Sequence, residues 1–234
     1  MKEGYNFEYI PIDISHDANL VLAENMKKNV ENLNMTLITA LFEEGVEWVF
    51  KNKKERNVYF ILGSTLGNNN DAEIHDFFKW ISTYMKKGDK FVVGVDMMKD
   101  PYLIQRAYFN ELGLENRFIM NNLSRINNEL EGTFDLDKFY PHTYFNPETK
   151  SERACIISKE DQTVKVHGKE YHFDAYETIE VLQSRKFTQE DLNRFGEQYG
   201  NMKTLQHFDD EKKYMRVCIY EKNWEPVNMI INKE

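Results

Sequence analysis

The sequence has only two cysteines, Cys155 and Cys218, among its 234 residues. Two cysteines are too few for a disulfide framework, which indicates a reducing compartment, and we expect a cytoplasmic protein. No apolar run approaches the roughly 20 residues that span a bilayer, and the first residues, MKEGYNFEY, lack the apolar stretch of a signal peptide. Positive charge is also scarce, because 30 basic residues stand against 39 acidic ones and the net charge is −9. That sign disfavours nucleic-acid binding as the main function and favours small-molecule metabolism.

Hydrophobic residues are plentiful at 41%, and aromatic residues make up 14%, so the chain has the composition of a folded domain. Short β-rich runs alternate with helical patterns over the first hundred residues. Strands are predicted at 9–15, 34–42, 58–62 and 90–98. The first is expected to be buried, and Asp71 is expected to cap the helix that follows the third. This alternation predicts an α/β fold with a mostly parallel sheet.

The pattern changes after residue 100. Helical pieces fill 101–131 with a break near Gly113, and a loop is expected from 133 to 150. Three runs with period-2 alternation, at 153–159, 162–174 and 176–187, predict antiparallel strands with a hairpin turn at His167-Gly168. A helix capped by Thr188 and two closing strands end the chain. We therefore expect a core over 1–114, an insertion over 115–184 and a return to the core over 185–234.

Three predicted strand ends carry residues suited to ligand binding, because ligands of open α/β sheets bind at the carboxyl ends of the strands. Asp13 and Asp96 each end a strand, and a carboxylate there can accept hydrogen bonds from the hydroxyls of a ribose. Each could equally be a helix cap or a solvated turn residue. The third end is LGSTLGN (62–68), whose two glycines let a ligand approach the backbone. Its glycine spacing is not that of a phosphate-binding loop, and no lysine follows.

Other kinds of active site are not indicated. The six histidines are scattered, and His167 and His172 lie across a predicted hairpin, so no metal site is expected. No Gly-x-Ser-x-Gly elbow occurs, and neither cysteine lies in a recognisable nucleophile motif. The residues alone therefore indicate an α/β protein with a nucleotide-like ligand.

Four stretches, taken together and in order, resemble one known family. They are YIPIDIS, VYFILGSTLGN, KKGDKFVVGVDMMKDPYLIQRAYFNELG and FIMNNLSRINNELEGTFDLDKF. In these stretches the chain is similar to the S-adenosylmethionine-dependent histidine Nα-methyltransferases of the ergothioneine-biosynthesis type. The resemblance implies a class I (Rossmann-like) methyltransferase core, an α+β insertion that forms the amino-acid pocket, and S-adenosyl-L-methionine as cofactor.

The resemblance also implies roles for individual residues. Asp13 matches the position that holds the cofactor ribose, and Gly63 and Gly67 lie in the loop beside the cofactor. The substrate-binding positions of the family match Asn68 for the amino group, Tyr108 for the carboxylate and Ser184 for the side chain.

The chain departs from the family pattern in three ways. The glutamate that reads the substrate imidazole is replaced by Leu182, so histidine is disfavoured and an apolar or aromatic amino acid is expected. The acidic residue expected to bind the adenine aligns with Leu41, although Glu43 or Glu44 could take its place. Only eight residues precede the strand that begins at Tyr9, too few for the strand, glycine-rich loop and helix that the family has there.

The expected function is N-methylation of an amino acid or related small amine, with no nucleic-acid or membrane partner. The alternative is a non-catalytic partner subunit or a truncated homologue of the same fold, in which another polypeptide, or a second copy of this one, completes the sheet and the cofactor site. A third reading keeps the amino-acid pocket but not methyl transfer.

Overall fold

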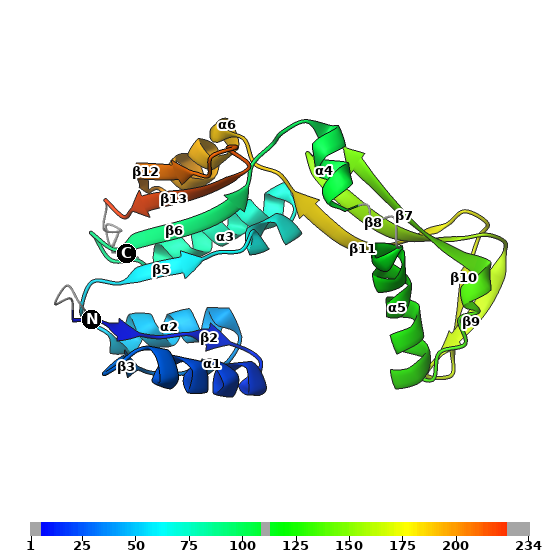
Figure 1. The fold of residues 1–234 in the computed structure, drawn as a ribbon, viewed down its shortest axis with the longest axis horizontal. Helices are drawn as coiled ribbons and strands as arrows, with labels where there is room; N and C mark the ends of the chain where they lie inside the picture. The colour runs from blue at the N-terminus through cyan, green and yellow to red at the C-terminus, as the bar shows by residue number, and fades with distance from the viewer. Residues whose placement is uncertain (1–5, 109–112, 224–234) are drawn as a thin grey trace, which may run out of the picture. The chain divides into compact units, whose positions relative to one another are not determined.

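A computed structural model describes residues 6–108 and 113–223 (Figure 1). The described chain forms two compact units. The first contains the residues up to Asn57 together with Thr83–Lys86, and the second contains Val58–Ser82 and the residues from Lys87 onward. Each unit is described by itself below.

The first unit pairs short parallel strands and carries two helices. Its elements are β1 (Glu8–Tyr9), β2 (Ile12–Asp13), α1 (His16–Asn29), β3 (Asn34–Met35), β4 (Ile38–Thr39) and α2 (Phe42–Asn52). β1 pairs with β3, and β2 pairs with β4, both in parallel. Ser15 caps α1 by accepting a hydrogen bond from the amide of Ala18 at 3.2 Å. The alternation of strand and helix predicted for this segment is confirmed.

The prediction of a buried strand over 9–15 is wrong in two respects. Two-residue strands take its place, with Pro11 between them, and no residue from Glu8 to Ile14 is buried. Proline has no amide hydrogen to donate to a ladder, although the Pro11 carbonyl still accepts one from Ile38 at 3.0 Å. Within the first unit, β1 and β2 each pair with a single strand.

The second unit contains the main sheet. Its strands are β5 (Val58–Ile61), β6 (Lys90–Asp96), β12 (Lys203–Asp209) and β13 (Met215–Glu221), in the order β12-β13-β6-β5 (Figure 1). β5 and β6 are parallel, whereas β13 runs antiparallel to both of its neighbours. The helix α3 (Asp71–Thr83) buries Phe78, whose ring contacts those of Phe91, Phe195 and Tyr220. The mixed α/β fold predicted from the sequence is confirmed.

The start of α3 differs from the prediction by one residue. Asn70, not Asp71, is the cap: its side chain accepts a hydrogen bond from the Glu73 amide at 3.0 Å, and the Glu73 carboxylate accepts one from the Asn70 amide at 2.7 Å. This reciprocal pair is a capping box. Asp71 is therefore free to form ion pairs with Arg185 and Arg194.

A second sheet follows β6 in the chain. The elements are α4 (Pro101–Ala107), α5 (Leu114–Glu129), β7 (Phe139–Asn146), β8 (Ser151–Ser158), β9 (Gln162–Val166), β10 (Lys169–Phe173) and β11 (Thr178–Arg185). The sheet has the order β11-β8-β7, all antiparallel, and α5 contributes Ile119 and Leu123 to the apolar core that it shares with the sheet and the β9-β10 hairpin. The predicted break at Gly113 (φ +64°) and the hairpin turn at His167-Gly168 (φ +50° and +74°) are confirmed. The proposed domain limits at 114/115 and 184/185 stay a prediction.

The segment 133–150 was expected to be a loop, and that expectation is wrong for β7. Pro141 and the irregular alternation of FYPHTYFN hide the strand in the sequence. β7 is an edge strand in the sheet order, and an edge is where a sheet tolerates proline.

The remaining elements are short. They are η1 (Thr65–Asn68), η2 (Leu136–Lys138), α6 (Gln189–Asn193) and the π-helical turn η3 (Arg194–Tyr199). The predicted cap at Thr188 is confirmed, and with Asp191 it forms a second capping box. Every helix in the described chain is too short or too polar to cross a membrane.

Candidate substrate and cofactor site

The second unit brings together Tyr108, Ser184 and a buried lysine that the sequence reasoning missed. Tyr108 ends α4, Ser184 lies near the end of β11, and Lys186 follows that strand directly. The Tyr108 hydroxyl donates to Ser184 Oγ at 2.7 Å. Lys186 Nζ donates to both oxygens, at 2.9 Å to Tyr108 and 2.8 Å to Ser184. Two predicted substrate residues from distant parts of the chain are therefore in direct contact.

Hydrogen-bond accounting indicates which ligand atoms this cluster can hold. Ser184 Oγ accepts two hydrogen bonds, so its own hydroxyl proton is left as a donor. Lys186 is only 1% exposed, whereas Tyr108 and Ser184 are half-buried and can be reached from outside. A ligand atom at Ser184 should therefore be a hydrogen-bond acceptor, such as a carboxylate oxygen or an unprotonated ring nitrogen.

Asp96, one of the candidate carboxylates at a strand end, is engaged within the protein. Its Oδ2 pairs with Lys186 Nζ at 2.8 Å, and its Oδ1 pairs with Lys99. A lysine as buried as Lys186 needs such a counter-charge. The structure thus gives Asp96 the role of holding Lys186 against Ser184 and Tyr108.

Glu152 is a further residue of this region that the sequence did not bring to notice. It lies on β8 directly opposite Ser184 on β11, and the two side chains share one face of the sheet. Glu152 is 1% exposed, and its Oε2 has no hydrogen-bond partner. Burial raises the pKa of Glu152 to about 7, Lys186 opposes that rise, and the negative charge of Glu115 adds to it.

The loop after β5 carries the remaining substrate and cofactor positions of this unit. Asn68 is exposed, and no hydrogen bond of its side chain occurs with the described residues. Gly63 has a φ of +75°, and a Cβ there would meet no atom within 4 Å, so the backbone is open to a ligand. Gly67 is different, because a Cβ would lie 2.8 Å from the Arg185 carbonyl oxygen. Close packing of η1 on β11 is a sufficient structural reason for that glycine.

Asp13 belongs to the first unit. It is exposed at the end of β2, and its Oδ1 accepts a hydrogen bond from the Ser15 amide at 2.7 Å. No hydrogen bond to Oδ2 occurs within the described chain, which leaves that oxygen for a ligand. Asp13 is therefore a turn residue, one of the two roles that the sequence left open. Its Oδ2 is still available as the acceptor that a ribose would need.

The fit of these residues to S-adenosylmethionine is partial. A free oxygen on Asp13 and the open backbone at Gly63 suit the cofactor. The described residues contain no strand and glycine-rich loop ahead of β1, the place where the resemblance puts that motif.

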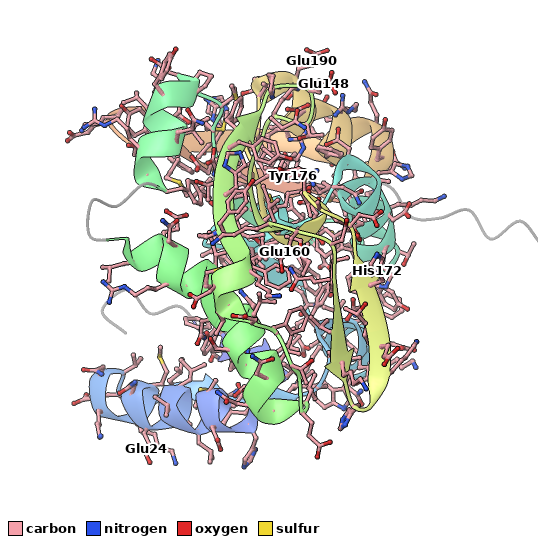
Figure 2. All side chains as sticks on the ribbon, turned by 90° about the vertical axis from the view of Figure 1, so that its right-hand side faces the viewer. Glu24, Glu148, Glu160, His172, Tyr176 and Glu190 are labelled. Carbon is pink, nitrogen blue, oxygen red and sulfur yellow. The ribbon has the colours of Figure 1, made fainter. Side chains whose placement is uncertain are left out.

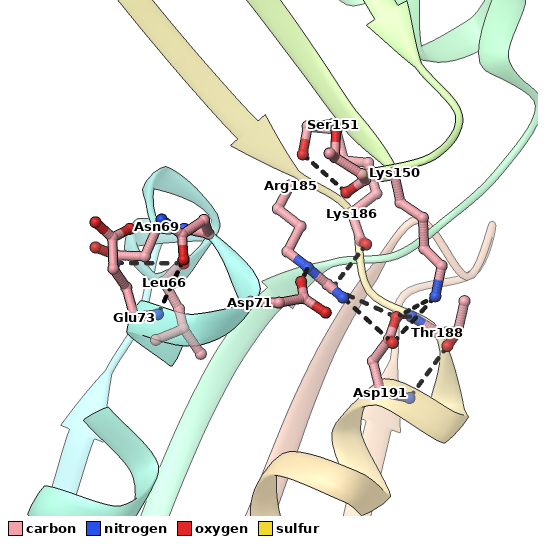
Figure 3. A network of polar contacts seen from close by, with 12 residues as sticks. Leu66, Asn69, Asp71, Glu73, Lys150, Ser151, Arg185, Lys186, Thr188 and Asp191 are labelled. Atoms are coloured by element: carbon pink, nitrogen blue, oxygen red, sulfur yellow. Dashed lines mark hydrogen bonds and ion pairs between the residues drawn. The ribbon is translucent and has the colours of Figure 1, made fainter. Parts of the chain in front are cut away.

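A network of charges on the other face of β11 fixes the end of that strand (Figure 3). Arg185 is 2% exposed and forms ion pairs with Asp71 on α3 and with Asp191 on α6, the latter at 3.2 Å. Lys150, from the turn between β7 and β8, also binds Asp191 at 3.0 Å. Burial alone would raise the pKa of Asp191, but the amide of Thr188 and these cations hold it at about 2. The network keeps Ser184 and Lys186 at a fixed position next to η1.

Two cavities in the second unit lie apart from the predicted residues. One, of about 520 Å³, is apolar and lies between α5 and the β9-β10 hairpin, and the other, of about 510 Å³, is polar and is lined by Asp71, Arg185 and Arg194 among others. None of the six predicted site residues lines either cavity. In the described chain, no group of three or more His, Cys, Asp or Glu side chains could hold a metal ion. His172 on β10 is exposed and contacts Thr163 and Asp174 (Figure 2).

The fold class is that of the class I methyltransferases, with an additional α+β sheet. A sequence profile of the histidine-specific, S-adenosylmethionine-dependent methyltransferases matches residues 1–222, and the chain belongs to this family. The resemblance stated from the sequence is confirmed, and S-adenosylmethionine is the cofactor of the family.

Individual relatives are more distant. A histidine N-alpha-methyltransferase of Mycobacterium tuberculosis is 26% identical over 76% of this chain and 56% of its own length. An L-tryptophan methyltransferase of Psilocybe serbica is 25% identical over 78% of this chain and 53% of its own length. Among solved structures, an S-adenosylmethionine-dependent methyltransferase of Clostridium acetobutylicum superposes with a TM-score of 0.47 at 10% identity, covering 93% of this chain and 76% of that one. The chain spans about half the length of the curated relatives that it matches.

Proposed function

We propose that this protein transfers a methyl group from S-adenosylmethionine to the amino group of an amino acid or related small amine. Family membership supports the reaction class. The cluster of Lys186, Tyr108 and Ser184 is the observation that carries the proposal, since it offers a reachable donor beside a buried positive charge. On Leu182 alone, an apolar or aromatic side chain on the substrate is favoured over histidine. The two buried free thiols suit a reducing compartment, and we propose a cytoplasmic location.

The proposed roles follow the geometry of each residue. In the second unit, Ser184 donates its hydroxyl proton to an acceptor atom of the substrate, and Tyr108, whose own proton goes to Ser184, contacts the substrate carboxylate. The free carboxamide of Asn68 accepts a hydrogen bond from the substrate amine. For the cofactor, Asp13 binds the ribose hydroxyls, and the backbone at Gly63 and Gly67 borders the ligand. The insertion 115–184 is proposed to form the substrate domain, since it carries Ser184 and Glu152.

The chemistry asks mainly for alignment. When bound, the cofactor supplies a methyl group that a sulfonium makes electrophilic. The chain must hold the amine with its nitrogen lone pair free and in line with that methyl, which is a matter of position more than of acid-base strength. An ammonium must lose a proton before it can react, so an acceptor near the amine lowers the barrier. The carboxamide oxygen of Asn68 orients the amine for this step.

Titration calorimetry with S-adenosylmethionine and S-adenosylhomocysteine tests the cofactor site. We expect heat of binding to the wild-type chain, weaker binding to Asp13→Asn, and unchanged binding to the control Asp17→Asn, which alters an exposed acid of the first turn of α1. Mass spectrometry after incubation with a mixture of amino acids should then detect a methylated product. No heat at high micromolar concentrations of protein and ligand would contradict the proposal.

A second candidate is a subunit that needs another chain to complete its sheet and cofactor site. Within the second unit β5 is an edge strand of the main sheet. Val58 and Phe60 on β5 are 49% and 65% exposed, and Leu62, directly after it, is 50% exposed. A free edge with exposed apolar side chains favours addition of a strand. A second copy of this chain could cover the same edge.

The two candidates differ in a simple mixing experiment. If the second is right, the chain alone gives no heat with S-adenosylhomocysteine. Binding should then appear after co-purification with a polypeptide, encoded next to it, that contains a strand, a Gly-x-Gly loop and a helix. A stable homodimer without cofactor binding would favour an interaction protein. Amino-acid binding without cofactor binding would favour a pocket that has lost methyl transfer, and thermal-shift measurements with amino acids test that reading.

A further inference from the structure

Glu152 has a placement that packing alone does not explain. Among the described residues, its Oε2 is the only buried carboxylate oxygen without a hydrogen-bond partner. Leaving such a group buried and unpaired destabilises a fold, and natural proteins retain unpaired buried acids mostly at functional sites. Asp191, the other deeply buried acid of this region, has four partners for its carboxylate: Lys150, Arg185, Arg194 and the amide of Thr188. Pairing was therefore attainable here.

The position of Glu152 puts it within reach of whatever Ser184 binds. The two residues are directly opposite in the β8-β11 register. Opposed residues of antiparallel strands have Cβ atoms about 5 Å apart, less than the combined length of a glutamate side chain and one ligand group. A ligand group within reach of Ser184 is therefore also within reach of Glu152, which can accept a hydrogen bond from it.

The same face of the sheet provides an apolar wall beside this pair. Leu182 and Ala154 are opposite each other, one pleat repeat from Ser184 and Glu152, and both belong to or pack against the apolar core under α5. An apolar surface next to one carboxyl group and one hydroxyl donor suits a flat ring that carries an N–H group. A plain hydrocarbon ring would leave the carboxyl group unpaired.

We infer that Glu152 is a specificity-determining residue that accepts a hydrogen bond from an aromatic ring N–H of the amino-acid substrate. This inference rests on the proposed function and names its substrate class: amino acids with an indole or imidazole ring rather than phenylalanine. Glu152 supplies the acceptor that Leu182 cannot supply, so leucine at position 182 no longer excludes histidine as a substrate. The substrate in turn gives Glu152 the partner that the protein lacks.

The test is calorimetry of L-tryptophan, L-histidine and L-phenylalanine with the full chain and S-adenosylhomocysteine at pH 8. We expect the wild type to bind tryptophan or histidine at least about 10-fold more tightly than phenylalanine, as a hydrogen bond to a charged group implies. Glu152→Leu should reduce that preference to less than about 3-fold, and Glu152→Gln should give an intermediate value. Glu170→Gln, on exposed β10, is the matched control and should keep the wild-type preference.

The pH dependence of tryptophan binding distinguishes the proposed role of Glu152 from a purely structural one. Tryptophan has no ring ionisation in this range, so its affinity for the wild type should rise as pH passes 7 and Glu152 becomes a carboxylate. The charged groups around Glu152 are Lys186 and Glu115, and replacing Glu152 by glutamine should abolish the rise.

Each outcome bears on one proposal. An unchanged preference in a folded Glu152→Leu variant, or no binding of any of the three amino acids to the wild type, overturns the role of Glu152. If S-adenosylhomocysteine gives no heat but the amino acids are discriminated through Glu152, the methyltransferase proposal fails and the role of Glu152 stands.

Discussion

At the scale of single residues, Asn68 and Glu152 are both expected to bind the substrate but to affect stability differently. Asn68 should be nearly neutral for stability, whereas Glu152 should lower it. Asn68 is exposed in η1 and makes no side-chain hydrogen bond with the described chain. We expect Asn68→Ala to change the free energy of unfolding by less than about 0.5 kcal/mol, as for other surface positions. The same variant should weaken amine binding about 10-fold, because a hydrogen bond to the ligand is lost. Thermal melts and calorimetry measure the two effects, and an equal loss in both would identify Asn68 as a cap.

Glu152 should make the fold less stable as pH rises. Its pKa of about 7 in the folded chain lies above the value of 4.5 expected in the unfolded chain. The folded state therefore holds one more proton between these values, and stability falls as pH rises from about 4.5 to 7. The full effect, present above pH 7, is on the order of 3 kcal/mol. Glu152→Gln should thus raise the melting temperature at pH 8 and change it little at pH 4.5. A lower melting temperature at pH 8 would show that the carboxylate has a stabilising partner.

The sequence allowed part of the site to be predicted: the strand ends indicated Asp96, and the family resemblance indicated Tyr108 and Ser184. Tyr108 and Ser184 were identified from RAYFN and QSRKF, and the structure places them in contact. Lys186 was missed because a charged run such as SRK is usually solvent-exposed. Glu152 was missed because SERACI gives no sign that its glutamate faces the core. Burial and cross-strand register decide both, and neither can be read from composition.

At the scale of elements, Asp191 connects three segments of the second unit. It binds Arg185 at the end of β11, Lys150 from the β7-β8 turn and Arg194 in η3, and it completes the capping box of α6. Asp191→Asn removes a negative charge that pairs with the buried guanidinium of Arg185. We expect the free energy of unfolding to fall by about 3 kcal/mol or more. We expect lower urea midpoints for this variant, and a much smaller change for Glu190→Gln, a neighbouring acid of the same first turn.

The pH dependence of Asp191 has the opposite sign to that of Glu152. Its pKa of about 2 lies below the ordinary value of 3.8, so its stabilising effect is complete above pH 3.8 and is lost as pH falls towards 2. The loss amounts to about 2 kcal/mol. Acid unfolding followed by circular dichroism should therefore begin at higher pH in Asp191→Asn than in the wild type, and coincident curves would contradict this role.

Element prediction succeeded where local chemistry and tertiary environment agree. Gly113, Thr188 and the turn at His167-Gly168 were predicted correctly because each has a local reason, a positive φ or a cap. β7 was missed because only its edge position makes Pro141 acceptable. The strand at 9–15 was predicted to be buried from its apolar residues alone. Burial of a strand depends on the elements packed around it, and the sequence does not show them.

At the scale of the whole molecule, the described strands divide between two units. The pairs β1-β3 and β2-β4 belong to the first unit, and β5 is the edge of the main sheet in the second. Any complete account of activity therefore depends on what covers β5.

The edge of β5 leads to the last prediction. Val58 and Phe60 alternate along the strand, so they lie on one face, and these two and Leu62, directly after the strand, are each about half exposed or more. An uncovered apolar edge strand promotes association between chains.

We expect the average mass measured by light scattering after gel filtration to rise with protein concentration. Phe60→Lys should remove most of this rise, because a charge on an edge strand opposes pairing, and its effect on the melting temperature should be small because Phe60 is already 65% exposed. The control Phe118→Lys, at a position of α5 that is 63% exposed, should leave the association unchanged. A wild-type chain that stays monomeric at all concentrations would show that β5 is covered within the monomer, and the need for a second polypeptide would disappear.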